Sequence, residues 1–211
     1  TGRGIFLNNF TNVTIQNCNI LNYTYGFHLN LTVKNTLINN TARNNSDDGF
    51  FIEDSNNNLL ISNNAINNTN GFHFDDSDNN TLVNSFSNEN SKYGIYLETS
   101  STNNNIINTV ASNSVGNDVY SSGRNNTFIN STFDKSKVTV TATADFTVKW
   151  YLDVYVNDTA GNNVSSANAT IYNVSGERIF SLLTASNGYI QTQNVTEYDN
   201  IGGAIYSYTN Y

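Results

Sequence analysis

The stretch Gly49-Phe50-Phe51-Ile52 is one of five close copies of a single line in this 211-residue chain. Consecutive copies begin 22, 23, 22 and 23 residues apart, and a weaker sixth, Asp118-Val119-Tyr120-Ser121, follows after 24. Self-similarity at such a period indicates a solenoid, in which each unit buries its apolar face against its neighbours. The other four copies are Gly4-Ile5-Phe6-Leu7, Gly26-Phe27-His28-Leu29, Gly71-Phe72-His73-Phe74 and Gly94-Ile95-Tyr96-Leu97.

Alternation within each copy predicts a short strand whose second and fourth residues point inward and whose third points outward. A second short strand follows eight to ten residues later, as in Asn58-Leu59-Leu60-Ile61. The repeat is too short for a propeller blade of about 40 residues and lacks the leucine-rich frame. We therefore expect an all-β fold, a right-handed parallel β-helix of about six coils with strands stacked about 4.8 Å apart.

Glycine and asparagine are expected at the corners between these strands. The glycine that opens each copy suits a corner where a Cβ atom would clash, and asparagine tolerates left-handed backbone. Stacked side-chain amides would also bond from coil to coil as a ladder. One asparagine opens each copy of the second strand: Asn12, Asn35, Asn58, Asn80, Asn104 and Asn126.

The repeat stops after Phe133, which predicts three regions: a β-helix over 1–134, a cap or linker over 135–149, and a second domain over 150–211. Turn signals separate four short expected strands there, which favours a small β-sandwich. About 60 residues are few for a sandwich, so we expect it to be truncated or completed by a strand from another segment. The expected strands are Leu152–Val156, Ala169–Val174, Arg178–Leu183 and Tyr189–Thr192.

Composition limits the classes of function. The net charge is −8, and only nine Lys and Arg are available to neutralise phosphates, which argues against nucleic-acid and anionic-membrane partners. No apolar run approaches the roughly 20 residues that span a bilayer. The single cysteine excludes an internal disulfide, and the absence of methionine predicts a processed or excised segment of a longer protein.

Two stretches, Gly94–Asn104 and Asn125–Ser131, resemble the β-helix repeats of the carbohydrate-binding and sugar-hydrolase (CASH) family, which includes NosD-like proteins. The tail from Thr147 to Val156 resembles the immunoglobulin-like (Ig-like) module that follows such helices in cell-surface proteins of methanogenic archaea. Together the two resemblances imply an extracellular protein of the archaeal cell surface, such as a surface-layer or sheath component. The β-helix repeat is specific for fold and unspecific for activity.

Catalysis would need paired carboxylates, or a bound cation beside a base, on one face. Acidic candidates exist at Asp47-Asp48, Glu53-Asp54 and Asp75–Asp78, but the few basic residues share no repeat position. No Gly-His-Gly or Arg-x-Lys element of the polygalacturonase type accompanies them. We therefore expect a protein that is not an enzyme and carries no cofactor, with calcium as the one candidate.

The calcium candidate is a row at the fifth repeat position, Asn8, Asn30, Glu53, Asp75 and Glu98. If the three stacked carboxylates are exposed to solvent, their repulsion costs little, since it is roughly 1 kcal/mol per neighbouring pair in water. Alternatively these oxygens bind Ca²⁺, a cation that prefers oxygen ligands. The candidate ligands are Glu53, Asp54, Asp75, Asp76 and Glu98.

The third repeat position forms a row of rings, for which two readings stand. Stacked rings stabilise neighbouring strands, whereas an exposed aromatic stripe would contact a glycan or a neighbouring subunit. The two histidines in the row are separated by a coil, so they are not expected to share a metal. The row consists of Phe6, His28, Phe51, His73, Tyr96 and Tyr120.

Fifteen N-glycosylation sequons occur, and those on predicted turns are the best candidates for modification: Asn22, Asn44, Asn67 and Asn157. Taken together, the sequence favours a non-catalytic extracellular surface protein, structural or adhesive, that assembles with itself or other surface proteins into a layer, sheath or filament. The alternative is a protein that binds or cleaves polysaccharides.

Overall fold

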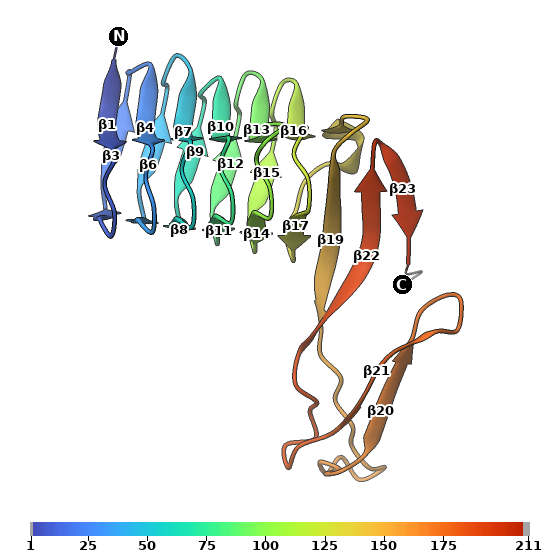
Figure 1. The fold of residues 1–211 in the computed structure, drawn as a ribbon. Coiled ribbons are helices and arrows are strands. Elements are labelled where there is room, and N and C mark those ends of the chain that lie inside the picture. The colour runs from blue at the N-terminus through green and yellow to red at the C-terminus, as the bar shows by residue number, and fades with distance from the viewer. Residues whose placement is uncertain (1, 209–211) are drawn as a thin grey trace.

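The computed structural model describes residues 2–208, and Figure 1 shows a solenoid of stacked coils followed by a segment that projects from its last strands. Three sheets, here called sheets I, II and III, run along the solenoid. Sheet I contains β1 (Arg3–Asn8), β4 (Tyr25–Asn30), β7 (Asp48–Glu53), β10 (Asn70–Asp75), β13 (Tyr93–Leu97), β16 (Asn117–Ser121) and β18 (Val138–Val140). Sheet III contains β3 (Asn19–Leu21), β6 (Thr41–Arg43), β9 (Asn64–Ile66), β12 (Phe86–Asn88) and β15 (Val110–Ser112).

Sheet II begins within the solenoid and continues beyond it. Its solenoid strands are β2 (Thr14–Gln16), β5 (Thr36–Ile38), β8 (Leu59–Ile61), β11 (Thr81–Val83), β14 (Asn105–Ile107), β17 (Asn126–Ile129) and β19 (Asp145–Leu152). The sheet is then extended by β22 (Gln193–Ile201) and β23 (Ala204–Ser207). Within the solenoid every pairing is parallel and joins one coil to the next, which confirms the predicted parallel β-helix.

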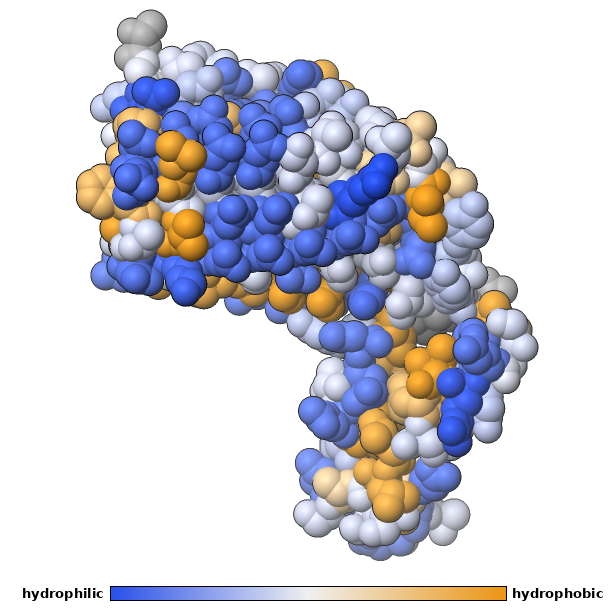
Figure 2. Space-filling model, in the orientation of Figure 1, coloured by the Kyte–Doolittle hydropathy of each residue, from blue (hydrophilic) through white to orange (hydrophobic). Residues whose placement is uncertain are grey.

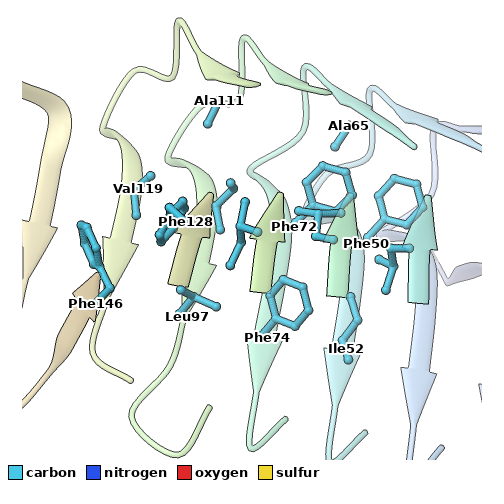
Figure 3. Packing of buried hydrophobic residues seen from close by; sticks show 14 of the residues in the cluster. Phe50, Ile52, Ala65, Phe72, Phe74, Leu97, Ala111, Val119, Phe128 and Phe146 are labelled. Carbon is cyan, nitrogen blue, oxygen red and sulfur yellow. The ribbon is translucent and has the colours of Figure 1, made fainter. Parts of the chain in front are cut away.

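The core lies between the three sheets, where equivalent residues of successive coils stack (Figure 3). Phe27, Phe50 and Phe72 are fully buried, with ring centroids 4.7 and 4.9 Å apart. Full burial of one such side chain is worth about 1.5–3 kcal/mol. Facing them, sheet III contributes small residues such as Ala65 and Ala111.

The repeat glycine meets the backbone of the next coil, which confirms the predicted Cβ clash, but it lies inside the sheet I strand, as Gly26 does in β4, and not at a corner. A Cβ atom on Gly26 would lie 2.5 Å from the carbonyl oxygen of Gly49 and 2.7 Å from the Cβ of Ala42. Because the carbonyl belongs to the stacked coil itself, no side-chain movement could relieve this contact. We therefore assign the glycine to close approach between coils.

Two asparagine columns, not one, form the corner before sheet II. Asn58 is buried, and its Oδ1 accepts the backbone N–H of Asn35 at 2.9 Å, while its own N–H donates to Asn80 at 2.8 Å. The left-handed residue is the one before it, Asn57, with φ 58°. We predicted that one asparagine in each coil would both adopt the left-handed backbone and form the ladder, and this is wrong because two neighbouring residues share these roles. In the first coil Asn12 belongs to the exposed left-handed column, since Val13 is the residue that aligns with Asn35.

A seventh, partial coil continues the six that were predicted. The expected cap over 135–149 contains a short 3₁₀ helix, η1 (Lys135–Lys137), and then adds β18 to sheet I and the first half of β19 to sheet II. Buried Phe146 and Val148 extend the core into this coil. Among residues 2–208, no helix is long and apolar enough to cross a membrane.

The Ig-like sandwich expected over 150–211 is not shown. Strand β22 pairs antiparallel with β19, and β23 with β22, so the strands that could build a second domain extend sheet II instead. Only β20 (Asn168–Tyr172) and β21 (Arg178–Leu183) form a separate two-stranded sheet, close to two of the predicted strands. An open cleft of about 650 Å³ lies between this hairpin and β22, lined by Leu152, Ile171, Val174, Ile179 and Val195 among others.

The predicted strands at 152–156 and 189–192 are reduced to one bridge, Tyr155 with Tyr189. Strand β22 was not predicted, because a bulge between Val148 and Lys149 shifts the pairing and interrupts the alternation opposite it. Chain end residues 209–211 of the expected domain lie outside the described residues.

Candidate functional site

The outer face of sheet I brings together histidine, acidic and aromatic side chains of the solenoid. Three columns run along it, set by the register of the parallel strands. The residue before the repeat glycine forms the pre-glycine column, the third residue the ring column, and the fifth residue the acidic column. The pre-glycine column is Arg3, Tyr25, Asp48, Asn70, Tyr93 and Asn117.

The ring column is a continuous stack whose middle is buried. Centroids of consecutive rings from Phe6 to Tyr96 lie 4.4–5.0 Å apart, and Tyr120 meets Tyr96 edge-on at 5.4 Å. His28 is 1 % exposed, whereas Phe6 at the first coil is 41 % exposed. Of the two readings of this row, stacked rings that stabilise the strands describe the middle of the column, where neighbouring rings cover the faces that a sugar would stack on.

His28 lies on a diagonal that begins at Arg3 and ends at Glu53. Arg3 Nε donates to His28 Nδ1 at 2.6 Å, so Nδ1 must be the unprotonated nitrogen. His28 Nε2 then carries the proton and donates to Glu53 Oε2 at 2.8 Å. Burial, helped by the Arg3 charge, lowers the pKa of His28 despite the opposing effect of Glu53. The imidazole is neutral.

His73 lies on the matching diagonal two coils later, which begins at an aspartate, Asp48, in place of an arginine. Its Nδ1 is 2.9 Å from Asp48 Oδ2 and its Nε2 is 3.0 Å from Glu98 Oε1. Carboxylates only accept, so both nitrogens are protonated. Burial lowers the pKa of His73, but hydrogen bonds and charge from Asp48 and Glu98 outweigh it and raise the pKa overall. Tyr96, 4.4 Å above this imidazolium, adds a cation–π contact.

The diagonal is a general rule of this face. The pre-glycine residue of one coil also contacts the ring-column residue of the next coil at two further places. Tyr25 stacks on Phe51 at 5.3 Å, and Tyr93 stacks on Tyr120 at 4.7 Å. Asn70 is the exception. Its Nδ2 donates to Asp48 Oδ1 at 2.7 Å, but its buried Oδ1 has no partner among the described residues.

The calcium candidates do not converge as a ligand set. Glu53 and Glu98 are bonded to the two histidines, and Asp54 and Asp76 lie at left-handed corners with φ 48° and 44°. Within residues 2–208, no three His, Cys, Asp or Glu side chains are placed to hold a metal ion. A melting experiment with millimolar calcium or a chelator is the measurement that checks this prediction.

Asp75 is the member of the acidic column that no histidine holds, because Phe51 occupies the corresponding ring position. Burial and the charges of Glu98, Asp76 and Glu53 raise its pKa. The structure gives no hydrogen bond to its carboxylate among residues 2–208. It is the free acid of this face.

All four turn sequons are exposed. Asn22, Asn44 and Asn67 stack in one left-handed corner column with φ 64°, 55° and 55°, and Asn157 lies in the loop after β19. Asn67 Nδ2 donates to Asn44 Oδ1 at 2.8 Å, and a glycan on Asn67 would replace one of the two hydrogens on that nitrogen. Glycosylation at these sites stays a prediction.

Sequence reasoning placed the ring and acidic columns and named Asp48 among the acidic candidates, but it missed Arg3 and did not predict that Arg3 and Asp48 contact the two histidines and set their charge. A signal was available. Both diagonals join residues 25 apart, from 3 to 28 to 53 and from 48 to 73 to 98. The pre-glycine column meets the ring column at an offset of one repeat plus three residues, and the ring column meets the acidic column at one repeat plus two.

Comparison with known proteins supports the fold. The family model described as a right-handed β-helix region matches residues 1–133, about two-thirds of the chain. The chain belongs to the right-handed β-helix family. No curated protein and no solved structure matches it significantly.

Proposed function

We propose that this β-helix protein is a non-catalytic structural or adhesive component of an extracellular cell surface, which assembles with copies of itself or other surface proteins. The observation that carries the proposal is that the two histidines on the outer face of sheet I are buried and hydrogen-bonded along their diagonals. Each histidine is hydrogen-bonded to a fifth-column acid, Glu53 or Glu98, so a substrate on this face would not reach the imidazole nitrogens.

Apolar exposure supports assembly. Exposed large hydrophobic side chains gather in the projecting segment, where Tyr172, Val174 and Leu183 are each about 60 % exposed. Clusters of this kind mark contact surfaces. The archaeal origin and the comparison with surface layers, sheaths and an Ig-like module rest on the resemblances of the sequence, and so does glycosylation of the corner sequons.

Electron micrographs of the native cell envelope and of the purified protein test this function. We expect ordered layers or filaments, and no new reducing ends when the protein is incubated with acidic and neutral glycans. Protein that remains dispersed at all concentrations, or glycans that are shortened, would contradict it.

Asp75 favours one alternative, a protein that cleaves polysaccharides. A carboxyl with raised pKa beside carboxylates on neighbouring strands, about 4.8 Å away, is an arrangement that supplies a general acid. In that case Asp75→Asn would abolish the release of reducing ends. The matched control, Glu89→Gln at an exposed corner, would leave it unchanged.

A further inference from the structure

The outer face of sheet II carries an apolar row that neither the solenoid core nor sheet I uses. Each short strand turns its middle residue into the core and its last residue outward. The strand register stacks these last residues directly on one another. This sheet II row consists of Ile38, Ile61, Val83, Ile107 and Ile129, all half-buried, and ends at Gln16 and Lys149.

No charge interrupts this face across five coils. The outward residues beside the row are Thr36, Leu59, Thr81, Asn105 and Thr127, also half-buried. Figure 2 shows hydrophobic residues along the lower border of the solenoid, where β8, β11 and β14 lie in Figure 1. In a chain of net charge −8 with carboxylates on sheet I, two copies approach here without like-charge repulsion.

We propose that this face packs against the same face of a second copy, with the two solenoids antiparallel and the two-fold axis at Val83. The proposal rests on the proposed function and names its lateral contact. Strand spacing is the same in both partners, so two β-branched rows can interdigitate as sheets do when they stack about 10 Å apart. Val83 then faces Val83, and Ile38 faces Ile129.

The end of the row selects this orientation. In a parallel arrangement Lys149 would face Lys149, whereas in the antiparallel one it faces the uncharged Gln16. An isologous two-fold contact also closes the pair.

The projecting segment enlarges the contact. Seven strands about 4.8 Å apart give a face on the order of 30 by 10 Å, less than the about 800 Å² per partner of a standard interface. Figure 1 shows the segment leaving β19 on the side of β8, β11 and β14, which forms an inside corner with this face. Tyr151, 42 % exposed and two residues after Lys149 on the same strand, begins that wall.

Cysteine cross-linking of the full chain tests the arrangement in a Cys18→Ser background. Val83→Cys should cross-link to itself with a short thiol reagent. Ile38→Cys and Ile129→Cys should each fail alone and cross-link when mixed. The control is Ser112→Cys, a half-buried outward position on sheet III, which should not cross-link. Val83→Lys should weaken association on the order of a hundredfold in sedimentation velocity, with the far-ultraviolet spectrum unchanged.

Self-linking by Ile38→Cys, or equal linking by Val83→Cys and Ser112→Cys, would overturn the arrangement. Ordered polymers that form without the Val83 cross-link would refute this contact and leave the proposed function standing. A chain that stays monomeric and never polymerises would refute this contact together with the self-assembly in the proposed function.

Discussion

His28 and His73 occupy the same place in coils two apart, both buried within one stack of rings, and yet one is neutral and the other charged. The single difference that matters is the pre-glycine residue one coil earlier, Arg3 or Asp48. The repeat thus determines where a side chain lies, while its diagonal neighbour determines its protonation. In a solenoid, one repeat position can therefore hold a neutral and a protonated histidine within a distance of about 10 Å, two strand spacings.

Removing the carboxylate from the charged diagonal should have the largest effect. In Asp48→Asn the buried imidazolium loses one of its two partners, and we expect a loss of about 3 kcal/mol in the free energy of unfolding by urea. The matched change on the neutral diagonal, Arg3→Gln, involves an exposed residue and should cost roughly 1 kcal/mol or less. Equal losses would refute the distinction between the diagonals.

The pH dependence of stability should have opposite signs for the two histidines. The folded pKa of His73 is raised, so its contribution is present below the unfolded value near 6.5 and lost as pH rises through the folded pKa. The folded pKa of His28 is lowered, so its contribution is lost as pH falls below about 6.5.

Urea unfolding between about pH 5 and 9 measures both contributions. His73→Gln should remove the loss on the alkaline side, and His28→Gln the loss on the acid side. The same pH profile in both variants would contradict the assignment of charges.

Exchanging one residue should convert the neutral diagonal into the charged one. Asp48 reaches the next ring position from the pre-glycine column, so an aspartate in place of Arg3 should reach His28 in the same way. In Arg3→Asp the pKa of His28 should move from below its ordinary value to above it, as followed by titration of the imidazole proton resonances. A pKa that stays lowered would mean that burial alone sets it.

The smallest effect is expected in the acidic column. Burial and the neighbouring carboxylates raise the pKa of Asp75 and so disfavour its ionised form in the fold, and Asp75→Asn should therefore stabilise the fold by a few tenths to about 1 kcal/mol. Glu98→Gln should instead destabilise it, since Glu98 holds His73. Thermal melting of both variants at pH 7 checks the contrast, which fails if both shift in one direction.

The β-helix could be predicted because its determinants are local and repeated. The glycine line, the inward Phe50 and Ile52 and the period of 22–24 residues each point to the same stack. The exact role of the corner asparagines could not be predicted, because Asn57 and Asn58 are chemically identical and only the register with Val13 and Asn35 separates left-handed from buried positions.

The candidate site was predicted in part. The ring and acidic columns follow from alternation, but their burial depends on diagonal neighbours in other coils, such as Tyr25 over Phe51. The projecting segment was the least predictable. Its strands pair with β19 across 40 residues and a bulge, and no repeat marks that register.

The asparagine ladders give the solenoid an electrical direction. Each Oδ1 points toward the preceding coil and each accepted N–H toward the following one, so the amide dipoles add along the axis. A second ladder lies at the corner before sheet I, where the N–H of Asn45 donates to Asn68 and the N–H of Asn68 donates to Asn90. In the coil after Asn90 a carboxylate replaces the amide, and Asp118 Oδ1 accepts the N–H of Ser114 at 3.1 Å. An aspartate terminates this amide column as it would the first turn of an α-helix, by bringing a full negative charge to the electropositive end.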